Sequence, residues 1–279
     1  MDKLLFWVSV LTSLQGTLSQ TDLRGKAFVF PRESSSDHVN LIAEVKKPLQ
    51  NLTLCLRAYS DLSRPYSLFS YNAQGKDNEL LIYKEKAGQY NLYIGRSKVT
   101  AKVVEDPLAP VHMCTSWESS TGIAEFWING KPLVKKGLKQ GYSVEPHPKI
   151  VLGQEQDSYG GSFDKSQSFV GEIADLYLWD TVLSPEEIQL VYQDSPPSPN
   201  ILNWRDLNYE VNGYVVTKPR VWDSKTSPGV SPSGGKFRVR PGDIYTECLT
   251  RAFSDDGGPA RRRELLSSYG HQTTYAANF

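Results

Sequence analysis

Short segments rich in β-branched and aromatic residues recur along most of the chain from residue 26 onward. Many of them alternate apolar and polar positions, which is typical of strands with one buried face. Polar turns separate them, and Asn129-Gly130 is a two-residue hairpin signal. The expected strands cover residues 26–31, 79–85, 90–95, 123–130, 149–153, 172–180 and 213–222. This pattern predicts an all-β fold, a two-sheet antiparallel β-sandwich or jelly roll, rather than a parallel sheet with crossover helices.

One helix is expected in the segment LSPEEIQLVYQ. Ser184 is placed to be the N-cap, Pro185 occupies the first helical position, and Glu187 follows the cap by three residues, which together make a capping box. The apolar positions after the cap are Ile188, Leu190, Val191 and Tyr192. The segment therefore predicts a single short helix lying on one face of the sandwich.

The N-terminus has the layout of a secretory signal. Lys3 precedes the apolar run of residues 4–14, and small residues follow. We expect a signal peptide over residues 1–19, with cleavage after Ser19 or Gln20. The apolar run is too short to span a bilayer comfortably, and no other apolar segment approaches the length of a transmembrane helix. The mature protein is expected to be secreted and extracellular, without membrane insertion.

The composition changes after Trp222. Residues 224–279 are rich in Ser, Pro and Gly and have no sustained hydrophobic periodicity, which predicts a largely disordered tail. The single domain before it is expected to cover residues 20–223. The run Arg261–Arg263 is interpreted as a solvated charge run, with a polyanion contact or a processing site as alternatives. Over the whole chain, 31 basic residues balance 31 acidic ones, so no global field favours nucleic acid, a membrane or a highly charged substrate.

Secretion changes how the three cysteines are interpreted. Cys55 and Cys114 lie in strand-like segments, and an oxidising compartment lets them pair, with two separate buried thiols as the alternative. Cys248 is left over, in the tail. Asn51 begins the one Asn-x-Ser/Thr sequence of the chain and is a candidate glycosylation site.

Residues 152–169 crowd side-chain oxygens into one short window, which fits a solvated loop, a catalytic carboxylate pair or a cation site. Glu155 and Asp157 alternate, so an extended chain directs both to one face. Retaining glycosidases need a second carboxylate roughly 5 Å from the nucleophile. On sandwich folds their acids typically follow a Glu-x-Asp-x-x-Glu pattern, and here Gly160 stands at the last position. A secreted β-sandwich glycoside hydrolase is therefore the alternative function and not the preferred one.

Other catalytic arrangements have little support. Glu172 and Asp175 have an odd spacing that places them on opposite faces of a strand. The four histidines have no nucleophile motif around them, and the acidic window contains no Cys or His cluster suited to zinc.

A calcium site fits the window better, because Ca²⁺ prefers about six to eight oxygen ligands from carboxylates, amides and backbone carbonyls. A second oxygen-rich spot lies just before the strand expected at residues 79–85. The candidate ligands from both segments are Asp77, Asn78, Glu155, the carbonyl of Gln156, Asp157 and Gln167. On residue chemistry alone, a calcium site and a plain acidic loop both remain open.

The segment HMCTSWES, residues 112–119, resembles the pentraxin signature His-x-Cys-x-Ser/Thr-Trp-x-Ser/Thr. The similarity extends through AFVFPRES, YSDLSR, DNELLIYKE, EFWINGKP, IVLGQEQDSYGG, SQSFVGEI and NILNW. The chain is thus similar to pentraxins over about residues 20–223, nearly the whole expected domain.

The resemblance implies a two-calcium site and a ligand pocket beside it. The first ion would use Asp77, Asn78, Glu155, the Gln156 carbonyl and Asp157, and the second would use Glu155, Asp157 and Gln167. Leu81, Tyr83 and Tyr93 would form a small apolar wall. In this family, paired tyrosines favour phosphoethanolamine and anionic, for example pyruvylated, sugars over phosphocholine.

The resemblance also implies the Cys55–Cys114 disulfide, a glycan at Asn51 and a cyclic homopentamer. Such a protein is not an enzyme but a calcium-dependent, lectin-like recognition protein of innate immunity. Its expected targets are phosphorylated or carboxylated sugars, amyloid fibrils, and chromatin or DNA, with complement and Fc receptors as downstream partners. The family's domain ends near Trp222, so the resemblance assigns nothing to residues 224–279.

Overall fold

The computed structural model describes residues 21–106 and 109–223. The predicted signal peptide, the tail and Cys248 lie outside the described residues. Among the described residues, no helix is both long and apolar enough to cross a membrane.

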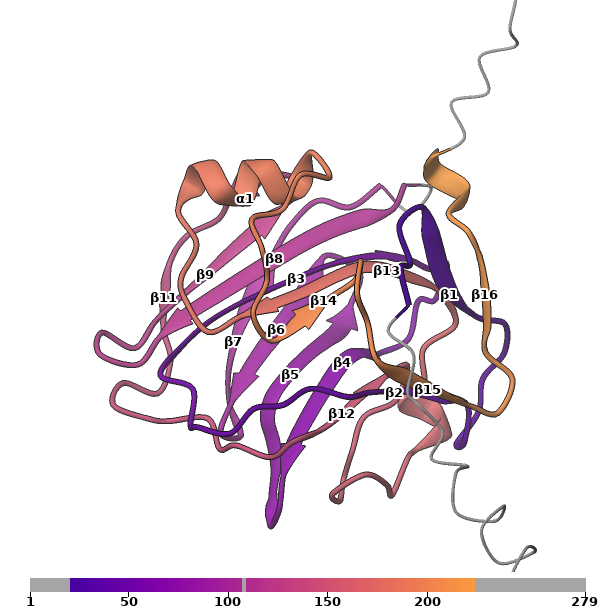
Figure 1. The fold of residues 1–279 in the computed structure, drawn as a ribbon, viewed down its shortest axis with the longest axis horizontal. Helices are drawn as coiled ribbons and strands as arrows, with labels where there is room; N and C mark the ends of the chain where they lie inside the picture. Colours follow the sequence, from indigo (N-terminus) through magenta and orange to yellow (C-terminus); the bar gives the residue numbers. More distant parts are fainter. Residues whose placement is uncertain (1–20, 107–108, 224–279) are drawn as a thin grey trace, which may run out of the picture. The chain divides into compact units, whose positions relative to one another are not determined.

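Two antiparallel sheets are stacked face to face, which confirms the predicted all-β sandwich (Figure 1). The first sheet has the order β10 (Lys131–Pro132), β9 (Ile123–Ile128), β8 (Val111–Glu118), β3 (Asn51–Tyr59), β13 (Gly171–Trp179), β1 (Lys26–Phe30) and β16 (Val216–Pro219), with β11 (Lys136–Gly137) paired to β9 and β14 (Leu202–Asn203) paired to β13. The second has the order β15 (Tyr209–Asn212), β2 (His38–Leu41), β12 (Lys149–Leu152), β4 (Tyr66–Ala73), β5 (Lys76–Lys86), β6 (Gln89–Ile94) and β7 (Ser97–Lys102).

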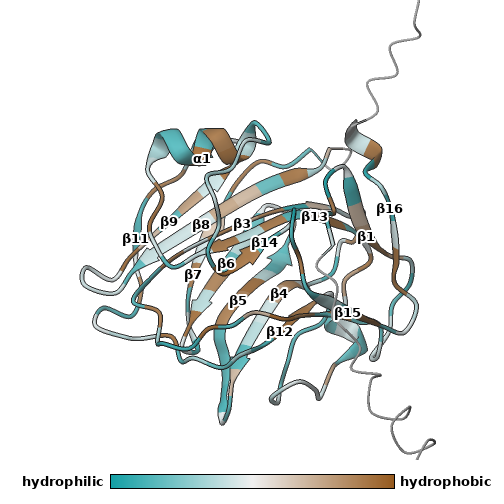
Figure 2. Cartoon of the chain, viewed as in Figure 1, coloured by the Kyte–Doolittle hydropathy of each residue, from teal (hydrophilic) through white to brown (hydrophobic). Residues whose placement is uncertain are grey.

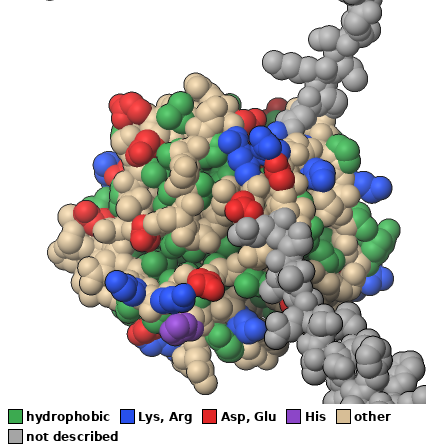
Figure 3. All heavy atoms as spheres, in the orientation of Figure 1, with side chains coloured by type: hydrophobic (Ala, Val, Ile, Leu, Met, Phe, Trp, Pro, Cys, Tyr) green, Lys and Arg blue, Asp and Glu red, His purple; other side chains and the backbone are tan. Residues whose placement is uncertain are grey.

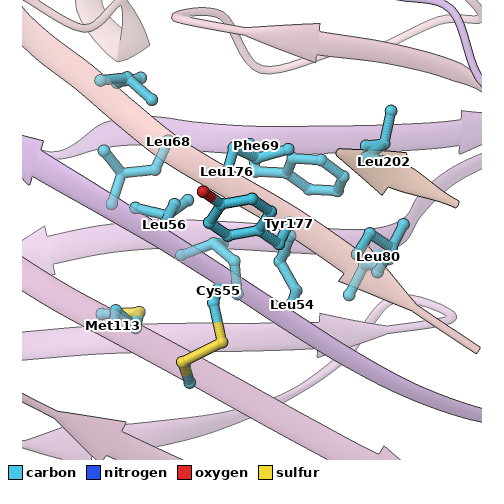
Figure 4. Packing of buried hydrophobic residues seen from close by; sticks show 14 of the residues in the cluster. Leu54, Cys55, Leu56, Leu68, Phe69, Leu80, Met113, Leu176, Tyr177 and Leu202 are labelled. Carbon is cyan, nitrogen blue, oxygen red and sulfur yellow. A yellow bond between two sulfur atoms is a disulfide. The ribbon is translucent and has the colours of Figure 1, made fainter. Parts of the chain in front are cut away.

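Buried apolar residues from both sheets form one core cluster. Coloured by hydropathy, the strands carry both hydrophobic and hydrophilic residues (Figure 2). On the face shown in Figure 3, acidic and basic side chains are interspersed. Figure 4 shows the packed layer between the sheets, where Leu54 and Leu56 of β3 meet Phe69 of β4 and Leu80 of β5, each at most 1% exposed. This alternation of buried and outward positions makes the strands recognisable from the sequence.

Cys55 of β3 and Cys114 of β8 are directly opposed partners in the first sheet and form a disulfide. The predicted pairing is confirmed, and the alternative of two separate thiols is wrong.

The predicted helix is α1 (Pro185–Tyr192), and its capping box is present as expected, with Ser184 Oγ accepting from Glu187 N at 3.2 Å. It lies over the outer face of the first sheet, near β8 and β9 (Figure 1). Ile188 and Val191 are buried against that face. Leu190 is 44% exposed, so only part of the apolar set packs on the sandwich.

Two parts of the strand prediction need correction. The segment expected as one strand over residues 213–222 is strand only over Val216–Pro219 and ends in the short 3₁₀ helix η2 (Val221–Asp223). The prediction also missed β2, β7, β15 and β4. All eight residues of β4 are buried, so this strand lacks apolar–polar alternation. Its outward residues are covered by the loop that follows β12, and that loop carries the acidic window.

Candidate calcium and ligand site

The loop after β12 is anchored to β4 by Gln156, which is fully buried. Its side-chain Nε2 donates to the backbone carbonyls of Ser70 at 2.9 Å and Lys149 at 3.1 Å, and its Oε1 accepts from Gly160 N at 2.9 Å. Because the side chain is used in this way, its backbone carbonyl is the group that Gln156 can offer to a ligand. The ligand role of this carbonyl stays a prediction from the resemblance.

Asn72 of β4 joins the two oxygen-rich segments. Its Nδ2 donates to the carbonyl of Gln156 at 2.7 Å, and its Oδ1 accepts from the backbone N–H of Asn78 at 2.8 Å. Asn78 has a left-handed φ of 52°, which asparagine tolerates better than most residues. Sequence reasoning missed Asn72, since a single asparagine in a strand carries no recognisable signal.

Gln167 is brought back toward the same place by the short 3₁₀ helix η1 (Lys165–Gln167). Asp164 caps this helix by accepting from Ser166 N at 2.8 Å. Arg64 holds this segment in place by donating hydrogen bonds to the carbonyls of Ser166 at 3.1 Å and Ser168 at 2.6 Å. Asp164 therefore supports the loop that carries Gln167.

These elements enclose a cavity of about 270 Å³. It is lined by Asn78, Leu81, Tyr83, Glu85, Tyr93, Lys98, Glu155, Asp157 and Gln167. The structure thus brings together four candidate metal ligands and all three residues of the predicted apolar wall.

Three oxygen atoms around this cavity are buried and accept no hydrogen bond from the described residues: Asn78 Oδ1, Glu155 Oε2 and Gln167 Oε1. A buried acceptor without a partner is unfavourable by about 1–3 kcal/mol. Carboxylate and amide oxygens are the donors that Ca²⁺ prefers. The residues present therefore fit a calcium ion. They come from two segments that are distant in the sequence, since Asn78 and Glu155 are 77 residues apart.

Burial raises the pKa of Glu155 to about 7, and the negative charge of the nearby Asp157 adds to the effect. Glu155 is only 4% exposed, whereas Asp157 is exposed. A cation bound between these carboxylates would stabilise the charged form of both.

Asp77 departs from the predicted arrangement, because it does not line the cavity. Its carboxylate is paired with Arg96 instead. Consistent with this, no group of three His, Cys, Asp or Glu side chains in the described part of the chain is gathered closely enough to hold a metal. The donors assembled at the cavity are two carboxylates and two amides.

The apolar wall comes from the pleat of β5 and its pairing with β6. Leu81, Tyr83 and Glu85 are two residues apart and share one face, and Tyr93 of β6 lies opposite Leu81. Burial raises the pKa of Tyr83 to about 12, so its hydroxyl stays neutral.

Glu85 and Lys98 form a charged pair at the end of this wall, with Lys98 Nζ 3.1 Å from Glu85 Oε2. The Lys98 ammonium also lies 5.5 Å from the ring centroid of Tyr93. Sequence reasoning missed both residues. The i, i+2 spacing from Tyr83 signals Glu85, but the position of Lys98 depends on the β6–β7 register.

The second acidic pair does not behave as its spacing suggests. A β-bulge interrupts β13 between Ala174 and Tyr177, and Asp175 adopts a left-handed φ of 51°. Its carboxylate consequently lies 3.1 Å from Arg57 Nε on the face that carries α1, and it also pairs with Arg220. Glu172 is paired with Tyr59, which lies on the same face of β3 as Arg57. Both acids therefore lie on one face, and the expectation that Glu172 and Asp175 lie on opposite faces is wrong. Asp175 is part of an ion-pair cluster.

Comparison with known proteins agrees with this architecture. Residues 26–219 match the model of the Pentaxin family. The chain is 72% identical over 223 residues to the serum amyloid P-component of Cavia porcellus, covering 80% of this chain and 100% of that protein. The serum amyloid P-component of Homo sapiens is 71% identical over 222 residues, with 80% and 100% coverage.

Among solved structures, the heptameric SAP-like pentraxin from Limulus polyphemus aligns with a TM-score of 0.65 and 23% identity, covering 73% of this chain and 99% of that one. At this identity the likeness shows the fold alone. The family match and the two close relatives show more, and they confirm the pentraxin resemblance: the chain belongs to the Pentaxin family, whose members are also called pentraxins.

Proposed function

We propose that this pentraxin is a secreted, calcium-dependent recognition protein that captures anionic ligands at the cavity lined by Glu155 and Tyr83. Pentraxins are recognition proteins and not enzymes, and the family as a whole implies calcium binding and ligand binding. The observation that carries the proposal is the set of three buried, unsatisfied oxygens beside an apolar wall.

Two calcium ions per subunit are proposed. Asn78, Glu155, Asp157 and the Gln156 carbonyl would hold the first, with Asp77 joining them. Glu155, Asp157 and Gln167 would hold the second. Bound calcium supplies positive charge with open coordination positions for a phosphate or carboxylate oxygen of the ligand. The chain's own part is to hold the donors in place through the Asn72 and Gln156 hydrogen bonds.

The wall selects the rest of the ligand. Leu81, Tyr83 and Tyr93 present a small apolar surface suited to a short carbon segment such as the ethylene group of phosphoethanolamine. Glu85 at the end of the wall offers a carboxylate to the ligand's ammonium group. Lys98 offers a cation to acidic sugars. We therefore propose phosphoethanolamine and carboxylated or phosphorylated sugars as ligands.

Assembly and targets follow from family membership and belong to the same proposal. The aligned pentraxin from Limulus polyphemus is heptameric, and the close relatives are by name serum proteins that carry the term amyloid. We propose a homopentamer here, secreted and glycosylated at Asn51, that binds amyloid fibrils and chromatin or DNA, with complement and Fc receptors downstream. Several weak sites on one rigid face would give avidity toward repetitive surfaces.

The proposal is tested by calorimetric titration of Ca²⁺ into the secreted protein and into Glu155→Gln. We expect binding by the parent and a large loss in the variant, because Glu155 is shared by both ions. Glu125→Gln, which removes a carboxylate paired with Lys135 elsewhere, serves as the matched control and should bind like the parent. Absence of calcium binding by the parent contradicts the proposal.

A resin carrying phosphoethanolamine tests the ligand. We expect retention in calcium and release by EDTA. Equal retention in EDTA would indicate a structural adaptor, and turnover of a polysaccharide abolished by Glu155→Gln would indicate the glycoside hydrolase.

A further inference from the structure

The carboxylate of Asp77 is held by an arginine from the neighbouring hairpin. Arg96 Nε donates to Asp77 Oδ1 at 2.6 Å, and Arg96 Nη2 donates to the same oxygen. Arg96 lies in the tight turn between β6 and β7, where Gly95 N donates to Glu79 O and Arg96 N donates to Asn78 O, both at 3.1 Å. These backbone bonds fix Arg96 beside the start of β5, so the fold itself places the guanidinium at Asp77.

This pairing gives the carboxylate of Asp77 a cationic partner from the protein itself. Asn78, Glu155, Asp157 and Gln167 line the cavity, whereas Asp77 does not. Both hydrogen bonds of Arg96 go to Oδ1, but the guanidinium offsets the charge of the whole carboxylate. Asp77 is therefore a weaker ligand for a second cation, even through Oδ2. The side chain of Arg96 is 68% exposed, whereas that of Asp77 is 26% exposed, so the arginine can move into water more easily than the aspartate.

We infer that Arg96 competes with calcium for Asp77 and thereby lowers the calcium affinity of the site. The inference rests on the calcium site proposed above and adds a residue that sets its affinity without being a ligand. In this inference Asp77 would contribute to the first ion, and the Arg96 guanidinium would move into solvent when the ion binds. Since the competing pair is an exposed one, its removal should tighten calcium binding by about two- to fivefold.

Calorimetric titration of Ca²⁺ into metal-free protein tests this inference on the parent, Arg96→Gln and Arg96→Lys. We expect Arg96→Gln to bind calcium about two- to fivefold more tightly, and Arg96→Lys, which keeps the charge, to remain closer to the parent. Arg24→Gln is the matched control, because Arg24 is 67% exposed and pairs with Asp22. It should bind calcium like the parent.

A double-mutant cycle shows whether the effect passes through Asp77. Asp77→Asn should weaken calcium binding, and adding Arg96→Gln to it should change nothing further. Unchanged or weaker binding by Arg96→Gln overturns the inference, and so does a gain that persists beside Asp77→Asn. A parent that binds no calcium refutes the proposed function together with the inference, whereas a parent that binds with no gain in Arg96→Gln refutes the inference alone. Thermal melts in EGTA confirm that each variant is folded.

Discussion

Gln167→Met should stabilise the calcium-free protein and destabilise the calcium-loaded one. The substitution keeps a long, unbranched side chain but removes the amide. Gln167 Oε1 is buried and has no hydrogen-bond partner among the described residues. An unsatisfied buried acceptor is unfavourable by about 1–3 kcal/mol, so replacing it with a thioether should recover at least about 1 kcal/mol in EGTA. For a domain of this size, that corresponds to a rise in melting temperature of about 2–4 °C.

In calcium the sign should reverse, because Gln167 is a proposed ligand of the second ion. A site filled at 100 times its dissociation constant adds about 2.7 kcal/mol to the free energy of unfolding. Losing that ion would outweigh the gain of about 1 kcal/mol from removing the amide. The melting curves of parent and variant should therefore exchange their order between EGTA and millimolar calcium, as measured by differential scanning calorimetry.

Gln154→Met is the matched control. Gln154 lies in the same loop and is fully buried, and its Oε1 likewise has no hydrogen-bond partner among the described residues. Its Nε2, however, donates to the carbonyls of Ser34 at 2.7 Å and Asp37 at 3.0 Å. Its removal leaves those carbonyls unsatisfied and should lower the melting temperature equally in EGTA and in calcium. A Gln167→Met variant that behaves like this control, with the same loss under both conditions, would refute the assignment of Gln167 as a ligand.

Three further predictions concern the scaffold and the wall. Replacing Cys55 and Cys114 together by alanine should lower the free energy of unfolding by about 4 kcal/mol in the chain-entropy model, because the disulfide closes a loop with a sequence separation of 59. Urea unfolding measures this loss, and a loss below about 1 kcal/mol would contradict the prediction. Burial lowers the pKa of His112 from 6.5 to about 3, so the unfolded chain takes up this proton as pH falls through 6.5 while the folded chain does not. The parent should thus lose about 2 kcal/mol of stability at pH 5 relative to pH 8 through this group, and His112→Gln should show a pH dependence flatter by that amount, in EGTA. Tyr83→Ala should weaken phosphoethanolamine binding about tenfold, because the ligand's two methylene groups would lose the apolar surface that buries them. The calcium affinity of this variant should not change, and an altered calcium affinity would contradict the role of Tyr83 as a wall residue.

Sequence patterns located most of the longer strands but missed β2, β4, β7 and β15. Strand β5 contains an unbroken apolar run from Leu80 to Tyr83, so its position was predictable from composition without apolar–polar alternation. Strand β4 has the same geometry, but its outward Ser70 and Asn72 are covered by the loop after β12. No local pattern indicates that a loop 80 residues away will fold back over a strand.

The candidate site shows the same division between chemistry and placement. The oxygen-rich composition of two segments indicated the ligand types, and family resemblance supplied the roles of Glu155 and Gln167. Which side chains come into contact depends on details of the fold that leave no recognisable pattern in the sequence. One is the amide of Asn72 that bridges the segments, and another is the bulge that turns Asp175 toward Arg57.

Asp77 illustrates why placement matters for function. By composition it is as good a calcium ligand as Asp157, and nothing in the sequence distinguishes the two. The fold does, because the β6–β7 turn sets an arginine against one of them and leaves the other exposed at the cavity. A site of this kind has equally good donors but unequal competition for them. If the proposed calcium site is correct, residues such as Arg96 would adjust its affinity without touching the metal, while the ligands themselves stay unchanged.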